Sequence, residues 1–285
     1  MLLRTSANRY TATAERALEM SEQEILTEID GPIARITFNR PHVRNALTSG
    51  MVETMREFLK KIEHDPSVRC VIMTGAGDHF MAGGDIAGFG RALDATPDER
   101  RRDFEQRARI AMPLFAVIER LPQPVIAKVR GACAGASVGW VAAADFVLLS
   151  ETALFVVAHI HLGTSPDGAV TWHLPRSIGL RKAKEMALLG ERLNAQQAVD
   201  AGLANRVVAD AELDAETEKL AQRLAAGPSV AIARTKRLLN ESNGRSLAQQ
   251  MDLETESFGA CAATDDFAEG IRAFNEKRKA VFNGH

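Results

Sequence analysis

The chain has 285 residues, of which 46% are hydrophobic and 25% are charged, and its formal net charge is −2. This apolar content is enough to bury a substantial core, in one large domain or in two smaller ones. A net charge so close to zero argues against a general affinity for nucleic acids or acidic lipid surfaces. No apolar run in the sequence approaches the roughly 18 residues that a membrane-spanning helix needs.

The three cysteines, Cys70, Cys133 and Cys261, lie far apart in the sequence. Without a CxxC pair or a Cys/His cluster they predict no metal site, and they favour a reducing compartment, the cytoplasm. Residues 1–20 carry basic side chains near their start. We interpret these residues as a loosely ordered extension, or as residues upstream of a natural start at Met20, rather than as a targeting signal.

Strand and helix patterns then alternate along the chain. Runs from Glu24 to Asp30 and from Ile33 to Phe38 have β-type composition and are separated by a Gly-Pro turn, which predicts a hairpin. Thr48 is a suitable helix N-cap, and apolar residues recur at helical spacing from Met51 to Ile62. The run from Cys70 to Thr74 is typical of a buried strand.

The remaining elements are predicted in the same way. Residues 87–121 predict helices with a polar interruption from Asp94 to Asp103, and strand patterns stop well before the C-terminus. Alternating strands and helices indicate parallel βα units followed by a helical region. We therefore assign residues 1–20 to the extension, residues 21–215 to an α/β core and residues 216–285 to a C-terminal helical region. The other expected strands are Val125–Val129, Phe146–Leu149, Ala153–Val157 and Leu203–Val208, and the other expected helices are Gly139–Ala144, 172–190 and Ala195–Ala201.

Residues 131–176 hold the most informative chemistry in the chain. Small residues from Gly131 to Gly139 follow a predicted strand, and such residues let a ligand approach backbone N–H groups closely. The turn from Ser165 to Gly168 leads into a helix and carries Asp167, a carboxylate in a place suited to proton chemistry. On the residues alone, an aspartate after Pro166 is more simply explained as a turn and helix-cap residue.

Several motifs, in their order along the chain, resemble the crotonase (enoyl-CoA hydratase/isomerase) superfamily over about residues 21–285. The segment from Phe80 to Ile86 resembles its first oxyanion-hole loop, and the segment from Ala134 to Ser137 resembles its second. The resemblance implies an α/β fold with a crotonase-like ββα spiral core and a C-terminal helical trimerisation region. The other matching motifs are Thr37–Pro41, Asn45–Leu47, Leu188–Gly190, Ala201–Leu203, Ala263–Asp266 and Phe274–Arg278.

The resemblance also implies a ligand and its contacts. Crotonases bind acyl-coenzyme A, and the thioester oxygen would lie between the backbone N–H groups of Gly84 and Ala136. Donors placed where negative charge develops stabilise an enolate, each by about 3–4 kcal/mol. No metal or redox cofactor is expected, because coenzyme A arrives as part of the substrate, and the assembly would be a homotrimer or a hexamer of two trimers. The residues expected near CoA are Arg44, Ala46, Ala82, Asp85 and Ile86, with Phe274 and Lys277 enclosing it from the same or a neighbouring subunit.

The two glutamates that hydratases of this family use are missing. Gly139 occupies the first glutamate position and His159 the second. Hydration needs an acid and a base around one water, and glycine supplies neither, so ordinary hydratase activity is not expected. His159 lies in an apolar, strand-like run, where a histidine is usually a buried or pocket-wall residue, and the alternative is a role as a second acid/base.

Asp167 is the replacement candidate. The segment from Ser165 to Arg176 resembles the isomerase branch that includes 1,2-epoxyphenylacetyl-CoA isomerases and some Δ3,Δ2-enoyl-CoA isomerases. In that branch an aspartate at this place moves a proton along the acyl chain, which one carboxylate can do while the oxyanion hole holds the dienolate. A related aspartate is the nucleophile of 4-chlorobenzoyl-CoA dehalogenase, which is the main rival chemistry. The resemblance therefore favours a catalytic Asp167.

Three hypotheses follow. The first is an acyl-CoA isomerase that uses Asp167 with Gly84 and Ala136. The second keeps the fold but changes the reaction to hydrolysis, dehalogenation or residual hydration, with His159 sharing the work. The third is a catalytically silent CoA-binding subunit. The other candidates are expected to be structural: His161 and His173, Asp145 as a cap or turn residue, and Cys133 as a small filler. Trp140 and Trp172 are most simply core residues, and the alternative is that either lines an acyl pocket.

Overall fold

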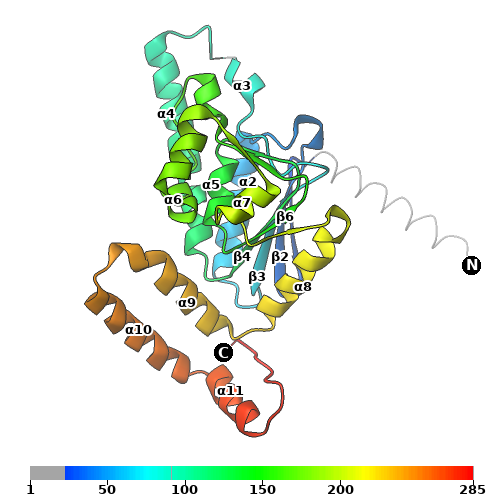
Figure 1. Cartoon of the computed structure of the whole chain (residues 1–285), viewed down its shortest axis with the longest axis vertical. Coiled ribbons are helices and arrows are strands. Elements are labelled where there is room, and N and C mark those ends of the chain that lie inside the picture. The colour runs from blue at the N-terminus through cyan, green and yellow to red at the C-terminus, as the bar shows by residue number, and fades with distance from the viewer. Residues whose placement is uncertain (1–22, 91, 285) are drawn as a thin grey trace, which may run out of the picture.

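A computed structural model describes residues 23–90 and 92–284, so the extension expected at residues 1–20 lies outside the described residues. The centre of the fold is a six-stranded sheet with the strand order β1-β2-β3-β4-β6-β9 (Figure 1). Strands β1 and β2 are antiparallel, which confirms the hairpin, and the other neighbouring pairs are parallel. The strands are β1 (Ile25–Asp30), β2 (Ile33–Phe38), β3 (Cys70–Gly75), β4 (Val125–Val129), β6 (Phe146–Ser150) and β9 (Arg206–Val208).

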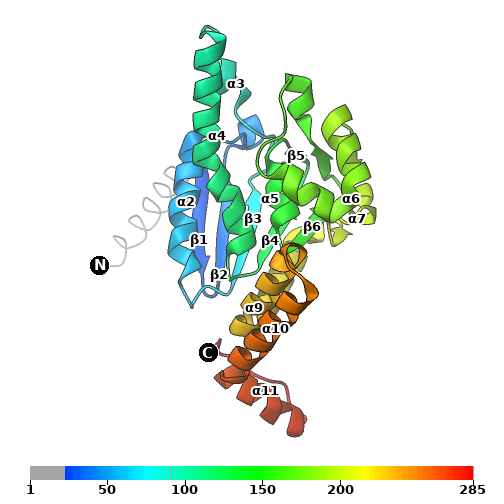
Figure 2. The same ribbon diagram turned by 90° about the vertical axis from the view of Figure 1, so that its left-hand side faces the viewer.

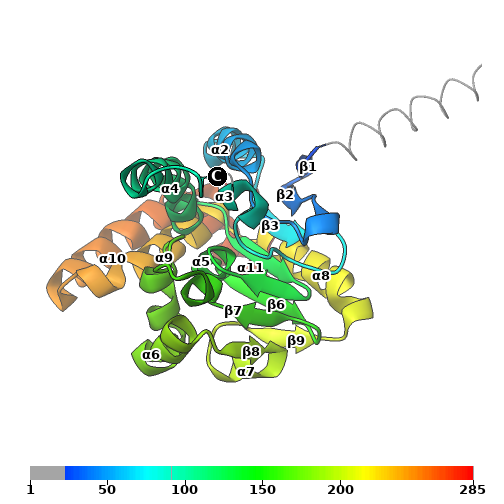
Figure 3. The same ribbon diagram turned by 90° about the horizontal axis from the view of Figure 1, so that it is seen from above.

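Helices cover both faces of this sheet because its middle strands are apolar on both sides. In β3, Val71 and Met73 face one core cluster, whereas Cys70 and Ile72 face another. The first cluster is completed by α2 (Ser49–Glu63), which lies beside β1 in Figure 2. The second is completed by α8 (Leu213–Ala225), on the other side of the sheet in Figure 3. A strand that is buried on both faces therefore has a continuous apolar sequence, as β3 does.

A second sheet of three short strands, in the order β5-β7-β8, stands beside the first. β5 (Ala132–Ala134) and β7 (Leu154–Val156) are parallel, and β8 (Arg192–Asn194) pairs antiparallel with β7. The sequence analysis expected neither β5 nor β8. Three residues are too few to display a period-two pattern, and β5 is built from small residues with low strand propensity.

Helix α4 (Pro97–Arg120) begins earlier than the sequence pattern indicated. The polar interruption expected from Asp94 to Asp103 ends at Thr96, because Thr96 and Glu99 form a capping box. The Glu99 carboxylate accepts from the Thr96 N–H at 3.0 Å, and the Thr96 hydroxyl accepts from the Glu99 N–H at 3.4 Å. The polar residues after Thr96 are thus the first turns of an exposed helix. The other helices of this part are α3 (Ile86–Gly90), α5 (Ser137–Ala143), α6 (Val170–Leu189, kinked at Gly179) and α7 (Ala195–Asp200), with 3-10 turns at Pro41–Val43, Ala158–Leu162 and Asp210–Glu212.

The last three helices extend away from the sheet, at the opposite end of the molecule from α3 (Figure 1). By packing, α8 belongs with the sheet, so this extension starts beyond it, later than the boundary expected at residue 216. The extension is anchored by the buried Lys236 of α9, whose Nζ lies 2.7 Å from Asp145 Oδ2. Within the described residues, no helix is both long and apolar enough to span a membrane. The three helices are α9 (Ser229–Glu241), α10 (Leu247–Ala262) and α11 (Asp265–Asn275), with a 3-10 turn at Ser242–Gly244.

Candidate active site

The first candidate loop, residues 81–85, is held in place from two sides. The Leu47 N–H donates to the Gly83 carbonyl at 2.8 Å on one side. On the other side the Ala134 N–H donates to the Met81 carbonyl at 2.8 Å. Because both edges of the loop are hydrogen-bonded, its small residues present their backbone at a fixed position. The loop therefore lies directly beside β5, the strand that leads into the second candidate loop.

Asn45 organises the residues that precede the first loop. Its side chain is fully buried: Oδ1 accepts from the Arg40 N–H at 2.8 Å, and Nδ2 donates to the carbonyls of Ala76 at 3.0 Å and His79 at 2.7 Å. Asn45 and Arg44 have φ values of 58° and 52°, a left-handed conformation that asparagine tolerates better than most residues. The sequence analysis gave Asn45 no role of its own, although an asparagine in a short strand-to-helix turn is a signal for this conformation.

The two candidate loops touch each other through glycines. A Cβ atom on Gly135 would lie 3.4 Å from the Gly83 Cα, and both glycines have positive φ values. Each glycine directly precedes a residue expected to donate to the thioester oxygen, Gly84 or Ala136. Neither of these two backbone N–H groups donates to an acceptor within residues 23–90 and 92–284. An oxyanion hole needs donors that are free, as these two are among the described residues, and that point at one oxygen, which stays a prediction here.

An aromatic wall lies against the first loop. A Cβ atom on Gly84 would come within 2.8 Å of the tip of the Phe89 ring, so a larger residue here would require the ring to shift. Phe89 in turn meets the ring of Phe104 edge-on, with ring centroids 5.0 Å apart. The side chains of α3 and α4 thus bring apolar surface to within contact distance of the expected oxyanion hole.

The turn that carries Asp167 packs against the second loop. Gly168 and Ala169 both have left-handed φ values, 63° and 57°, and the Val170 N–H donates back to the Asp167 carbonyl at 3.2 Å. A Cβ atom on Gly168 would lie only 2.7 Å from the Cβ of Ala136. The close contact between Gly168 and Ala136 places the turn that carries Asp167 against the loop that holds the second expected donor.

Asp167 is paired with His159. The His159 Nε2 lies 2.9 Å from the Asp167 Oδ1, and the Asp167 N–H approaches the same nitrogen at 3.4 Å. The imidazole side chain is 10% exposed, whereas the Asp167 side chain is 52% exposed. The sequence analysis expected His159 on a strand, but it lies on the 3-10 helix Ala158–Leu162. This correction matters because the tight helical turn aims the ring at Asp167, eight residues later.

Gly139, at the first hydratase glutamate position, has no room for a side chain. A Cβ atom there would lie 1.9 Å from the carbonyl oxygen of Gly168, far inside any permitted contact. The backbone of the Asp167 turn therefore occupies the space into which a side chain at position 139 would have to project.

Comparisons with known proteins agree with this geometry. The sequence model of the enoyl-CoA hydratase/isomerase family matches residues 28–285. The chain belongs to this family. It is 35% identical over 260 residues to the 1,2-epoxyphenylacetyl-CoA isomerase of Escherichia coli (strain K12), covering 91% of this chain and 98% of the relative. It is 34% identical over 264 residues to the crotonyl-CoA hydratase of Syntrophomonas wolfei, covering 92% and 99%.

A solved structure, of an enoyl-CoA hydratase from Polaromonas sp. JS666, superposes with a TM-score of 0.84 at 33% identity, covering 91% of this chain and 99% of that one. The crotonase fold class and superfamily expected from the sequence are thereby confirmed, as is an enzyme of the hydratase/isomerase family. Both isomerases and hydratases are among these relatives, so the reaction has to be argued from the site.

The residues expected near CoA fall into two groups. Arg44, Ala46, Ala82, Asp85 and Ile86 lie along the first loop and the turn before α2, with Arg44 and Ile86 exposed. Asp85 also has a structural role: its Oδ1 accepts from the Gly88 N–H at 3.2 Å at the start of α3, and its Oδ2 lies 3.4 Å from Arg40. Contact of any of these residues with CoA remains a prediction.

Phe274 and Lys277 form the second group. Phe274 lies in α11 and is 82% exposed, and Lys277 follows that helix with a φ of 55°. Figure 1 shows α11 at the end of the molecule opposite α3, so one chain does not bring these two residues to its own candidate site. Their expected role therefore requires another subunit.

The remaining candidates divide between core and surface. Trp140 is fully buried between the rings of Phe38 and Phe115, which confirms it as a core residue. Trp172 is 53% exposed with the Arg176 guanidinium 3.4 Å above its ring, so the core assignment was wrong for this residue. Asp145 does more than cap a turn, since its carboxylate, 16% exposed, is the partner of the buried Lys236. Cys133 is buried as expected, and burial raises the pKa of its thiol to about 12.

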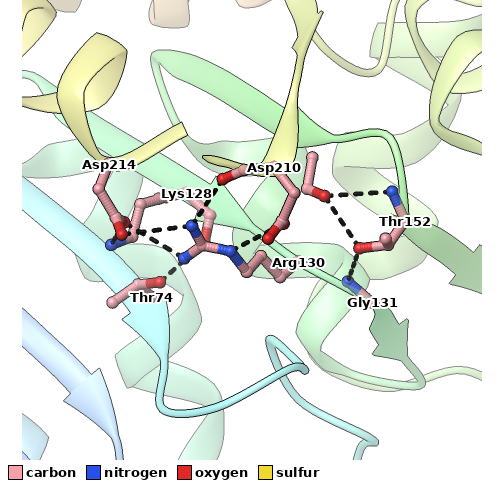
Figure 4. A network of polar contacts seen from close by, with 8 residues as sticks. Thr74, Lys128, Arg130, Gly131, Thr152, Asp210 and Asp214 are labelled. Carbon is pink, nitrogen blue, oxygen red and sulfur yellow. Dashed lines mark hydrogen bonds and ion pairs between the residues drawn. The ribbon is translucent and has the colours of Figure 1, made fainter. Parts of the chain in front are cut away.

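A surface ion network braces the end of β4 just before the second loop (Figure 4). The Arg130 guanidinium pairs with Asp210 at 2.9 Å and with Asp214 at 3.2 Å, and Lys128 pairs with Asp214 at 2.5 Å. Gly131 and β5 follow directly, so the network ties the base of the second loop to the start of α8. Among the described residues, no three His, Cys, Asp or Glu side chains are grouped as a metal site would need.

Proposed function

We propose that the chain is an acyl-CoA isomerase that shifts a double bond, or rearranges a strained ring, through an enolate. The observation that carries the proposal is the contact between Gly139 and the Gly168 carbonyl, which excludes the first hydratase glutamate. With that glutamate absent, the carboxylate beside the expected oxyanion hole is Asp167. One carboxylate is sufficient for a proton shift, whereas hydration needs two groups around a water.

In the proposed reaction, Asp167 takes a proton from one carbon of the acyl chain. The negative charge moves onto the thioester oxygen, where the N–H groups of Gly84 and Ala136 stabilise it. The carboxylic acid then returns the proton two carbons away, so the carboxylate is regenerated and no other reactant is consumed. The half-exposed position of Asp167 supports this role, because a carboxylate that shuttles protons must reach the substrate.

Two relatives support isomerisation. The Escherichia coli relative is named a 1,2-epoxyphenylacetyl-CoA isomerase, and a Streptococcus mutans relative, 32% identical over 268 residues, is named a trans-2-decenoyl-[acyl-carrier-protein] isomerase. Both names describe rearrangements of thioesters. We extend to this chain the shared element, an acyl thioester substrate, and propose CoA as its carrier after the Escherichia coli relative, without a metal or redox cofactor.

We also propose a homotrimer, or a hexamer of two trimers, in which Phe274 and Lys277 reach a neighbour's CoA. The support is an uncovered apolar surface on the C-terminal helices. Helix α10 has no buried residue within one chain, so its apolar side chains need a partner to leave water. The exposed residues are Leu247, Met251, Phe258, Ile271 and Phe274.

The test is proton exchange in deuterated water. Wild-type protein and Asp167→Asn are incubated with a 3-enoyl-CoA, and product is followed by mass and by the absorbance of the conjugated thioester. The matched control is Asp200→Asn, an exposed aspartate that only accepts a side-chain hydrogen bond from Gln196. We expect isomerisation or deuterium exchange in the wild type and the control, and its loss in Asp167→Asn. Unchanged exchange in Asp167→Asn would refute the proposal, and water addition to a 2-enoyl-CoA would favour residual hydration instead.

A further inference from the structure

The contact between His159 and Asp167 also indicates where the ring proton lies and which carboxylate oxygen is free. An ionised carboxylate only accepts hydrogen bonds, so the shorter contact, 2.9 Å to Oδ1, places the proton on the His159 Nε2, and the longer 3.4 Å approach of the Asp167 N–H to the same nitrogen is then no hydrogen bond. This nitrogen is bonded to Oδ1 alone among the carboxylate oxygens. The Asp167 Oδ2 accepts no hydrogen bond from the part of the chain that the structure describes, and it is therefore the oxygen left for a ligand.

The other ring nitrogen of His159 is equally informative. Nδ1 is buried and has no hydrogen-bond partner among residues 23–90 and 92–284. A doubly protonated ring would bury a second N–H donor without an acceptor, which costs more than leaving a lone pair there. Burial also keeps Nδ1 from exchanging a proton with a substrate. Among the described residues, the imidazole is thus held through Nε2, which donates to the Asp167 carboxylate.

We propose that His159 is a positioning residue, which holds one oxygen of Asp167 so that the other faces the acyl chain. This inference rests on the proposed function, because it assigns His159 a role within that reaction. The Asp167 side chain is 52% exposed, and without the bond to His159 its carboxylate would rotate freely into solvent. A reacting group that is misplaced by about 1 Å can lose about 100-fold in rate.

Two substitutions separate positioning from acid/base catalysis. The amide nitrogen of glutamine in His159→Gln can donate from near the Nε2 position, but an amide acts as neither a general acid nor a general base at neutral pH. His159→Phe keeps the ring volume and removes the donor. His161→Gln is the matched control, because His161 is exposed on the same 3-10 helix. His159→Leu serves as a second donor-free variant if His159→Phe does not fold.

The experiment measures kcat and KM for a 3-enoyl-CoA, with the melting temperature of each variant. We expect His159→Phe to lose about 100-fold in kcat with an unchanged KM. His159→Gln should recover most of that loss, and His161→Gln should match the wild type. Equal inactivity of His159→Gln and His159→Phe would overturn the inference in favour of proton transfer at His159. Wild-type kcat in His159→Phe would also overturn it. Activity in Asp167→Asn would instead overturn the proposed function, so the two failures are distinguishable.

Discussion

Gly139→Ala directly tests the packing that distinguishes this site from a hydratase site. Gly139 is buried in α5, and a Cβ atom there would lie 1.9 Å from the Gly168 carbonyl oxygen, although real Cβ atoms essentially never come within 3.0 Å of another atom. The backbone at Gly139 or at Gly168 must therefore move by about 1 Å, the difference between these two distances. The matched control is Gly259→Ala in α10, where the new Cβ would meet nothing within 4 Å.

The two substitutions should change stability in opposite directions. Overpacking against backbone costs about 3 kcal/mol, and the better helix propensity of alanine offsets about 1 kcal/mol of that. Gly139→Ala should therefore lose about 2 kcal/mol of unfolding free energy, whereas Gly259→Ala should gain about 0.5–1 kcal/mol. At about 2–4 °C per kcal/mol, their melting temperatures should differ by about 5–12 °C. Thermal unfolding followed by circular dichroism at one protein concentration measures this, because association also shifts the melting temperature.

Turnover should respond to the same displacement. Since Gly168 follows Asp167 directly, a shift of about 1 Å in this turn should reduce the isomerase kcat of Gly139→Ala by about 100-fold. Gly139→Glu should suffer the same clash and gain no hydration of a 2-enoyl-CoA. If Gly139→Ala kept the melting temperature and the kcat of the wild type, the turn would not be packed against α5 as described, and the steric argument against a hydratase site would fail.

Three further predictions concern other parts of the chain. Lys236→Met should lose about 3–5 kcal/mol of stability by leaving Asp145 buried without its partner, and the double variant with Asp145→Asn should recover part of that loss in thermal unfolding. The Arg278 guanidinium lowers the pKa of Glu269 to about 2, so the stabilisation of the C-terminal tail is present above pH 4.5 and lost as the pH falls towards 2. As the pH falls across that window, pepsin cleavage of the wild-type tail should rise relative to cleavage of Glu269→Gln, a comparison that cancels the pH dependence of pepsin itself. Iodoacetamide at pH 8 should label Cys261 before the two buried cysteines, whose pKa burial raises to about 12, as peptide mass spectrometry would report.

The elements that were predicted correctly from the sequence are those in which a full face of the strand or helix packs against the core. Strand β3 is apolar throughout because helices cover both of its sides, and α2 shows a helical apolar stripe after the Thr48 cap. The elements that were missed are short. β5 and β8 have three residues each and owe their extended form to neighbouring strands, which no local pattern encodes.

The candidate site likewise contains residues that were expected from the sequence and relationships that were missed. The roles of Gly84, Ala136 and Asp167 come from the family resemblance, since on the residues alone these segments are typical of ordinary turns; the structure brings their loops into contact, and the roles stay predictions. The partnership of His159 with Asp167 was not predicted, since the histidine was expected on a strand and only the geometry of the 3-10 helix aims its ring. The structural work of Asn45 was missed because its partners lie 31 and 34 residues away.

Position 139 has no room for a side chain, and this limits the ways in which a hydratase site and this site could have diverged within the family. A hydratase site and this site do not differ by a single side chain at position 139, because that side chain and the turn at Gly168 claim the same volume. Restoring the glutamate alone would break the turn, and changing the turn alone would leave no acid or base at position 139. Ala169, held in a left-handed conformation that costs about 1 kcal/mol or more in alanine, indicates that the turn is kept despite strain. This strained turn carries Asp167 and packs against the loop of an expected oxyanion donor. The simplest explanation of the strain is that the turn preserves the position of the Asp167 carboxylate.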